Sequence, residues 1–556
     1  MGKRILKRCL HYDGPFFILL ALLFYLAAPW LTRWLSSTVS NDFFDFSALY
    51  GVFIRLALLG IWLYAAITHF QEISYSEKTD GRSYRDDRRK YGRSYRELVN
   101  YFKNADPHKL DLAPFPEIPW QEGEGIILGS VEGKLIHLPS NAEANLFIAG
   151  SPGSRKTTGI AIPTCLRYGG SVLAVDIKGD IYNTCHEYRH ILRFCPDLTD
   201  DAGNEIATQV SCHFSPFNGL AQMTETERKL YLNNMAMILI PDHGGDDESY
   251  FNSRAQKLFA GITLFLYNQK NTVTFPEVLH AILHFTQPEG IDLESFPTNV
   301  FDWITTIIED GYPAAVEQVA SLYGSNEKNV GGAYDTLCTA LLPFSNDILD
   351  KLLDGKGECI SLDAMEQGYD VYLQISQKNL DVYAPLFTMI INAFMTGFTS
   401  RPDTSTALGR TNRPMLIMLD EFPQLTFSYS MINTALSTLR SKSIQCMLIA
   451  QSVAQLATSY PGESWRALLG NCTYQAILKS NEKLTQQHFS ALFGTRKVLK
   501  VSNSTSSSGK DESSGRSVHE EREPVFQPED FNDLQKKLVI DYNGRRVLAD
   551  KINLFE

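Results

Sequence analysis

The sequence lacks any cysteine arrangement that could hold a metal ion. Its nine cysteines are scattered, with no C-x-x-C pair and no histidine-rich partner spacing, which argues against a zinc site. Cysteines used in this way are typical of reduced, mostly buried thiols in a cytosolic domain. Disorder is also excluded, because apolar residues make up 44% of the chain and charged residues 21%. A chain of 556 residues is too long for one core and predicts two or three domains.

Positive charge is scarce beyond the first hundred residues. Residues 1–100 contain 14 Lys and Arg against 9 Asp and Glu, a net charge of +5. Since the whole chain carries −12, the remainder carries −17. A body this acidic is a poor general surface for nucleic acid. Any binding of nucleic acid must therefore use a local basic lining, which several subunits could assemble.

The N-terminal region contains two long apolar runs. Residues 15–31 hold no charge, and residues 47–70 are interrupted only by Arg55. Each run can cross a hydrocarbon layer of about 30 Å, which needs roughly 20 residues. A cleaved signal peptide is the rival interpretation of the first run, but a second run follows closely and no convincing small-residue cleavage site separates them. Residues 1–75 are therefore predicted to form a membrane anchor.

Basic residues flank the two runs and predict their orientation. A basic stretch, residues 82–96, follows the second run. Four basic residues precede the first run: Lys3, Arg4, Lys7 and Arg8. This distribution places both termini and the body of the protein in the cytoplasm, with a short outward-facing connection between two spans. Residues 76–144 are predicted to be a basic juxtamembrane segment followed by a β-rich lead-in.

Residues 145–158 read NLFIAGSPGSRKTT and place a glycine loop between an apolar strand and a helix. Such a loop cradles phosphates with its backbone N–H groups, while its lysine bridges the terminal phosphates and its threonine hydroxyl ligates Mg²⁺. The predicted ligands are therefore ATP and Mg²⁺. The residues predicted to bind them are Gly150, Ser151, Pro152, Gly153, Ser154, Arg155, Lys156, Thr157 and Thr158.

One position departs from the usual pattern G-x-x-x-x-G-K-[ST]. Arg155 stands where glycine normally precedes the lysine. A side chain there gives up the ease with which glycine approaches a phosphate, although the backbone N–H remains and the guanidinium can itself contact phosphate or solvent. Taken alone, the pattern is equally compatible with a glycine-rich turn that binds no ligand.

A second apolar strand, residues 415–419, ends in the carboxylates Asp420 and Glu421. A carboxylate at such an edge can hold the Mg²⁺ shell, and the next one can orient and deprotonate the attacking water. The alternative is a strand followed by an acidic turn. Together with Lys156 and Thr157, the pair favours a nucleotide site.

A third strand, residues 445–452, places Gln451 near its end, where nucleotide motors sense the γ-phosphate. Arg440 lies 19 residues beyond Glu421 and can enter a neighbouring subunit's site to stabilise transition-state charge. The alternative for Arg440 is a surface arginine on a solvated helix. The predicted catalytic residues are Glu421, Lys156, Arg440 and Gln451. The predicted metal ligands are Thr157 and Asp420.

Strand and helix patterns alternate in residues 145–224 and 346–556, as in a parallel α/β sheet. Between them, residues 225–345 follow a helical period. Residues 180–192 are predicted to be a helix. The serine-rich tract, residues 502–517, is of low complexity and is predicted to be a mobile surface loop.

In this order, the segments resemble those of a type IV secretion coupling protein, in the TraG/TraD-like branch of the FtsK/HerA-type RecA-fold ATPases. The double membrane anchor contributes to the resemblance. The motifs that carry it are GSPGSRKTTGIAIPT, VLAVDIKGDIY, DVYLQIS, LDEFPQL, LRSKSIQCMLIAQSVAQL and PEDFNDLQ.

The resemblance implies an α/β fold in which a RecA-like P-loop motor domain, residues 145–224 and 346–556, contains an inserted all-α domain, residues 225–345. Two transmembrane helices in the inner membrane of a bacterium would precede it. The implied protein is a hexameric ATPase that feeds single-stranded DNA with its relaxase, or secreted effector proteins, into a type IV secretion channel. Two alternatives stay open: a coupling protein for protein cargo alone, and a non-hydrolytic docking scaffold with a disabled loop.

Overall fold

The computed structural model describes residues 125–131, 133–197, 211–241, 246–404, 412–508, 511–542 and 545–552. The predicted membrane spans and the basic stretch that follows them lie outside these residues. Within them, one helix, α15 (Leu380–Thr399), is long and apolar enough to cross a membrane, and 56% of its apolar window is buried inside the protein. Core helices of soluble domains share these properties. The chain divides into two compact units, which are described separately.

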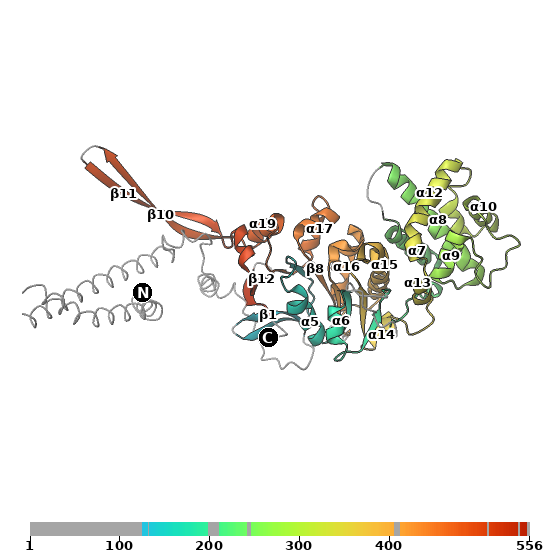
Figure 1. Ribbon diagram of the computed structural model, residues 1–556, viewed down its shortest axis with the longest axis horizontal. Coiled ribbons are helices and arrows are strands. Elements are labelled where there is room, and N and C mark those ends of the chain that lie inside the picture. Colours follow the sequence, from blue (N-terminus) through green and yellow to red (C-terminus); the bar gives the residue numbers. More distant parts are fainter. Residues whose placement is uncertain are drawn as a thin grey trace, which may run out of the picture. The chain divides into compact units, whose positions relative to one another are not determined.

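An eleven-stranded sheet organises the larger unit (Figure 1). Its strand order is β2-β1-β13-β12-β9-β3-β8-β7-β4-β6-β5. From β9 to β5 the neighbouring strands run parallel. These strands are β3 (Leu146–Ala149), β4 (Ser171–Ile177), β5 (Ile191–Phe194), β6 (Asp370–Ile375), β7 (Met415–Leu419), β8 (Ile444–Ala450) and β9 (Tyr474–Ile477). They are nearly continuous apolar runs because both faces of a parallel sheet are covered.

Four antiparallel strands from the two ends of the described chain extend this sheet. They are β1 (Gly125–Val131), β2 (Lys134–Pro139), β12 (Lys537–Tyr542) and β13 (Arg545–Asp550). β12 pairs with β9 on one side and with β13 on the other, and β13 meets β1 where Ser130 lies opposite Asp550. The β-rich lead-in therefore joins the same sheet as the phosphate-loop strand.

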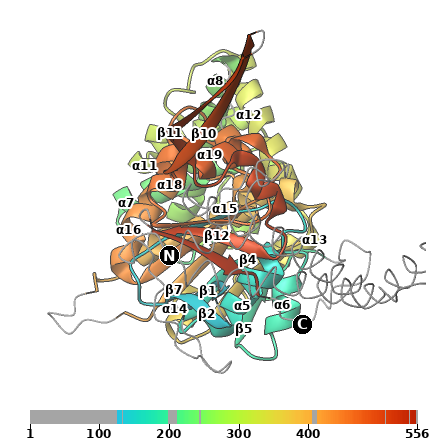
Figure 2. The same ribbon diagram turned by 90° about the vertical axis from the view of Figure 1, so that its left-hand side faces the viewer.

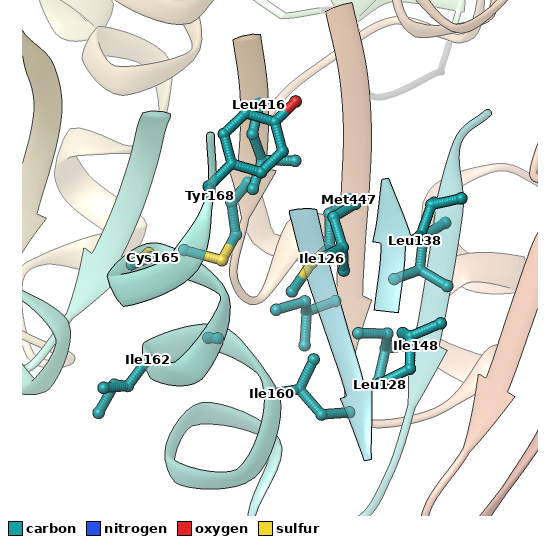
Figure 3. Close-up of a cluster of buried hydrophobic side chains, with 14 of the residues drawn as sticks. Ile126, Leu128, Leu138, Ile148, Ile160, Ile162, Cys165, Tyr168, Leu416 and Met447 are labelled. Carbon is teal, nitrogen blue, oxygen red and sulfur yellow. The ribbon is translucent and has the colours of Figure 1, made fainter. Parts of the chain in front are cut away.

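The helix that follows β3 packs on one face of the sheet. Figure 3 shows Ile160 from the turn Thr157–Ala161, Ile162 and Cys165 from α5 (Ile162–Arg167), and Tyr168, which directly follows α5, beside apolar side chains of the strands. The labelled strand residues are Ile126, Leu128, Leu138, Ile148, Leu416 and Met447. α6 (Asp180–Cys185) contributes to the same buried cluster and lies beside α5 in Figure 2. This packing fixes the start of the helix relative to the strand ends.

Helices occupy the interval between β5 and β6. They are α7 (Glu225–Leu239), α8 (Asp246–Lys270), α9 (Phe275–His284), α10 (Val300–Asp310), α11 (Pro313–Val319), α12 (Glu327–Leu341), α13 (Asp347–Leu352) and α14 (Leu362–Glu366). α7, α11 and α12 all pack against α8. Capping boxes at Thr224 and Thr274 set the starts of α7 and α9, since each threonine accepts from the N–H three residues on. The assignment of residues 225–345 as a separate domain stays a prediction.

Two segments differ from the sequence prediction. The serine-rich tract, residues 502–517, lies in β10 (Thr495–Ser508) and β11 (Asp511–Pro524), an antiparallel hairpin of the smaller unit. The two strands pair continuously through their backbones, so the hairpin needs no apolar alternation that a sequence pattern could reveal. The helix predicted over residues 180–192 ends at Cys185, and Ile191–Phe194 form the edge strand β5 because they pair with β6.

Candidate functional site

The carboxyl ends of four neighbouring parallel strands meet at one edge of the sheet. β3, β8, β7 and β4 end just before Gly150, Gln451, Asp420 and Lys178, respectively. Ligands of open α/β sheets bind at such an edge. A pocket of about 310 Å³ lies there. It is lined by Pro152, Gly153, Ser154, Arg155, Lys156, Thr157, Thr158, Ile177, Lys178, Asp180, Gln377, Asp420, Glu421 and Gln451.

The glycine loop after β3 is held in a tight path by backbone hydrogen bonds to β8 and within the loop. Gly150 N–H donates to the carbonyl of Ala450 at 3.2 Å, and Ser154 N–H donates to the carbonyl of Ser151 at 3.0 Å. A Cβ on Gly150 would stand 2.6 Å from Ser154 Oγ, so any side chain there would displace this hydroxyl. Ser154 Oγ is buried and has no hydrogen-bond partner among the described residues. A buried hydroxyl without a partner inside a glycine loop fits a bound phosphate.

Arg155 adopts the backbone conformation that glycine normally supplies at this position. Its φ is 71°, in the left-handed region, which costs a side-chain-bearing residue about 1–2 kcal/mol. Its carbonyl accepts a hydrogen bond from Gly159 N–H at 2.9 Å, which begins the following helix. The side chain is exposed at the pocket. The loop therefore keeps the path of a glycine loop despite the arginine.

The helix after the loop begins with a widened turn. Residues Thr157–Ala161 form one π-helical turn, η2, in which Ile162 N–H donates to the carbonyl of Thr157. Pro163 follows within α5 and has no N–H to offer to a regular turn. π-helical turns are rare in proteins, and many of those that occur lie at functional sites. Thr157 and Thr158 line the pocket at this helix start, where N–H groups and the helix dipole favour an anion.

Lys156 points its ammonium at the loop itself. Nζ donates to the carbonyl of Gly150 at 2.7 Å, and only 8% of the side chain is exposed. Burial lowers the pKa of Lys156, while the negative charges of Glu421 and Asp420 oppose that shift. The lysine is therefore close to both carboxylates that follow β7.

Asp420, Glu421 and Gln451 form a connected group across the pocket. Gln451 Nε2 donates to Glu421 Oε1 at 3.0 Å, and Glu421 N–H donates to Asp420 Oδ1 at 3.0 Å. Glu421 has a left-handed φ of 49°, and its Oε2 is buried without a hydrogen-bond partner among the described residues. Burial, followed by the charge of Glu421, raises the pKa of Asp420 to about 6.

The donor set fits a metal ion only together with a phosphate. The described residues contain no group of three or more His, Cys, Asp or Glu side chains that could hold a metal by themselves. Mg²⁺ in phosphate-binding sites keeps several waters and takes one or two carboxylates plus phosphate oxygens. Asp420 and Thr157, which line the same pocket, meet that requirement.

Arg440 is the predicted site residue that the structure places elsewhere. It lies in the turn η8 (Leu439–Lys442), directly before β8, whereas Gln451 directly follows β8. Seven residues of strand span about 23 Å. Arg440 is therefore at the opposite edge of the sheet from the pocket and does not line the pocket of its own chain.

Three polar pocket residues were missed by the sequence prediction: Lys178, Asp180 and Gln377. Lys178 lies in the turn after β4, Asp180 begins α6 directly after that turn, and Gln377 follows β6. Each comes just after an apolar strand, as Asp420 and Gln451 do. The same rule, applied to every predicted parallel strand, would have found them.

Comparison with known proteins relates the chain to proteins of bacterial secretion. Residues 93–555 match the family model described as "Type IV secretory system Conjugative DNA transfer". Conjugal transfer protein TraG from Escherichia coli is 22% identical over 387 residues, which cover 67% of this chain and 59% of TraG. Protein VirD4 from Rhizobium radiobacter is 21% identical over 382 residues, which cover 67% of this chain and 51% of VirD4. The chain thus spans between half and three-fifths of these curated relatives.

Solved structures share the fold. The plasmid coupling protein TrwB in complex with a non-hydrolysable ATP analogue matches with a TM-score of 0.56 and 16% identity, over 78% of this chain and 90% of TrwB. TrwB in complex with ADP and Mg²⁺ matches over the same shares with a TM-score of 0.54 and 15% identity. The predicted fold class is confirmed as mixed α/β, with a large parallel sheet similar to the RecA-like TrwB.

Proposed function

Since the chain belongs to the type IV secretory system conjugative DNA transfer family, we propose that it is a membrane-anchored ATPase that couples substrate to a type IV secretion channel. Its proposed substrate is single-stranded DNA carrying a relaxase, and ATP hydrolysis drives the transfer. One observation carries the proposal: Lys156, Asp420, Glu421 and Gln451 line one pocket, and Gln451 Nε2 lies 3.0 Å from Glu421 Oε1. A phosphate-binding lysine and a positioned carboxylate are the parts that nucleotide hydrolysis requires.

The glycine loop would bind the phosphates of ATP. Its N–H groups and the buried Ser154 hydroxyl point to this role, and Lys156 would exchange the Gly150 carbonyl for the terminal phosphates. Thr157 and Asp420 would hold Mg²⁺, which when bound neutralises charge on the phosphate oxygens. In this state Asp420 must be ionised, because a protonated carboxyl is a poor metal ligand.

Glu421 would act as the general base. Its Oε1 is already held by Gln451 Nε2, so the side chain has a fixed orientation. Its Oε2 has no hydrogen-bond partner among the described residues and would accept a proton from the attacking water. Gln451 would thereby link the state of the terminal phosphate to the position of the base.

Arg440 would act on a neighbouring subunit. Its position at the opposite edge of the sheet, about 23 Å from the end of β8, keeps it out of its own pocket. In a homo-hexameric ring, this edge would face the pocket of the next subunit, where an arginine stabilises transition-state charge. The proposed division of labour places the motor in residues 145–224 and 346–556, substrate contacts in residues 225–345, and a cytoplasmic-membrane anchor in residues 1–75.

The test compares the full-length chain with its Lys156→Ala variant in nucleotide binding, ATP turnover and transfer of a marked plasmid between cells. We expect Lys156→Ala to abolish turnover and transfer at normal membrane abundance. Lys351→Ala is the matched control, because Lys351 is an exposed lysine on α13, outside the pocket and outside residues 225–345. It should leave all three measurements unchanged.

Two other results would each replace the proposal. A wild-type chain that neither binds nor hydrolyses ATP, with transfer intact in Lys156→Ala, would favour the docking scaffold with a disabled loop, which Arg155 suggests. Turnover without plasmid transfer, but with Lys156-dependent export of effector or toxin proteins, would favour a coupling protein for protein cargo.

A further inference from the structure

The turn after β4 brings a second lysine into the pocket. Lys178 lines the pocket, and its side chain is exposed there. It has no side-chain hydrogen bond or ion pair with any other residue that the structure describes. Both Lys178, with a φ of 82°, and Gly179, with a φ of 81°, adopt the left-handed conformation. A left-handed backbone conformation in a residue other than glycine persists only where the surrounding structure enforces it. Residues in such conformations are found most often at functional sites.

The base of this turn is pinned on both sides. Lys178 N–H donates to the carbonyl of Ile375 at 3.1 Å, which ties the turn to β6. Asp176, fully buried at the end of β4, accepts from Ile181 N–H at 3.2 Å and from Tyr182 N–H at 2.7 Å. These bonds close the chain around Lys178 and Gly179. The lysine therefore sits at the tip of a fixed turn.

A lysine in this left-handed turn carries a backbone strain that glycine would avoid. Glycine and asparagine adopt a left-handed φ at lower cost, so a residue needed only for the turn would be one of them. Gly179 does meet a steric demand, because a Cβ there would stand 2.6 Å from Gln374 Nε2. Lys178 meets no such demand. Its charge is the property that remains to explain its presence.

The charges around the pocket show what Lys178 faces. Burial is the main cause of the lowered pKa of Lys156, and the charge of Lys178 adds to it. Burial and Glu421 raise the pKa of Asp420, and Lys178 opposes that shift. Two ammonium groups close enough to repel each other across one pocket favour an anion between them.

We propose that Lys178 is a second phosphate-binding cation of this site, which contacts the terminal phosphate of the nucleotide from the side opposite Lys156. The inference rests on the proposed ATPase function and adds a residue to it. Since ADP lacks the terminal phosphate, the contribution of Lys178 is confined to ATP and to the transition state of its hydrolysis.

Three substitutions separate charge from backbone conformation. Lys178→Ala removes the charge and keeps the strain, Lys178→Gly removes both, and Lys178→Arg keeps the charge. In the full-length chain we expect Ala and Gly each to lower kcat about 100-fold, the scale found when one transition-state contact is removed. ADP affinity should stay within about threefold, and Arg should recover at least tenfold of the loss. Lys351→Ala again serves as the surface-lysine control.

The outcomes distinguish this inference from the proposed function. Normal turnover in Lys178→Gly would overturn the inference and leave Lys178 as a turn residue, while wild-type turnover would still support the ATPase. Equal weakening of ADP and of a non-hydrolysable ATP analogue would also overturn it. Absence of turnover in the wild type would instead refute the ATPase. If Lys178→Ala melts early, Lys178→Gly carries the test, because it relieves the strain.

Discussion

Replacing Glu421 with glutamine isolates its chemistry from its structural role. The substitution removes a negative charge and a base but keeps the shape of the side chain. The amide oxygen can still accept the hydrogen bond from Gln451 Nε2, which the carboxylate now accepts at 3.0 Å. The change therefore leaves the pocket's architecture in place.

The expected effect of Glu421→Gln on folding stability is much smaller than its expected effect on the rate of hydrolysis. A hydrogen bond to a charged group contributes about 1.5–3 kcal/mol and a neutral one about 0.5–1.5 kcal/mol, so Glu421→Gln should cost folding about 1 kcal/mol. A positioned general base contributes about 10²–10⁴ in rate, equivalent to about 3–5 kcal/mol of activation free energy. Loss of the Glu421 charge also removes one cause of the raised pKa of Asp420, so Mg²⁺-dependent nucleotide binding should be retained.

The assay measures ATP turnover and binding of a non-hydrolysable ATP analogue in the full-length chain with Mg²⁺. Turnover should fall by at least 100-fold in Glu421→Gln with binding preserved. Gln451→Ala is the matched control, since it removes the hydrogen bond but keeps the base, and it should cost about tenfold. Turnover within about threefold of wild type in Glu421→Gln, with intact binding, would refute the assignment of Glu421 as the base.

Three further predictions follow from burial and backbone strain. Mg²⁺-dependent nucleotide binding should weaken as the pH falls through about 6. Burial, and then the charge of Glu421, raise the pKa of Asp420 to that value, and only the ionised carboxylate ligates the metal. A pH titration of nucleotide binding with a midpoint near 4 would contradict this. Arg155→Gly should relieve about 1–2 kcal/mol of left-handed backbone strain, against a cost of about 0.5–1 kcal/mol for the greater backbone entropy that glycine loses on folding. The melting temperature with ADP should therefore not fall, and ATP turnover should be preserved. A tenfold loss of turnover would show that the guanidinium is needed. Arg189→Ala should lower the free energy of unfolding by about 3–5 kcal/mol, because it removes the ion-pair partner of Asp370, whose side chain is 1% exposed. A loss below 1 kcal/mol in denaturant unfolding would contradict this.

The strands that carry the site were predictable because each is a short apolar run that ends in a polar residue. β7 covers the predicted residues 415–419, and β8 delivers Gln451 as expected. A parallel sheet follows from such runs, since both of its faces are buried. Convergence of Lys156, Asp420 and Gln451 is then a consequence of parallel strands ending at one edge.

Other features depend on contacts that local patterns do not encode. The order that places β8 between β3 and β7 is set by packing of distant segments. The predicted helix, residues 180–192, ran into the first two residues of β5, because these residues acquire strand geometry only through pairing with β6. The left-handed conformation of Lys178 could not be predicted from the sequence, because lysine is not a residue typical of that conformation.

The placement of β12 and β13 has a consequence for biosynthesis. These strands bridge β1, at the start of the described chain, to β9 and the parallel core. The carbonyl of Ile552, just after β13, would lie 3.2 Å from a Cβ on Gly159, in the helix that follows the phosphate loop. A ribosome therefore finishes the loop long before it makes the segment that supports the loop's helix. The proposed ATPase activity should therefore not appear in a nascent chain until residues 537–552 have been synthesised.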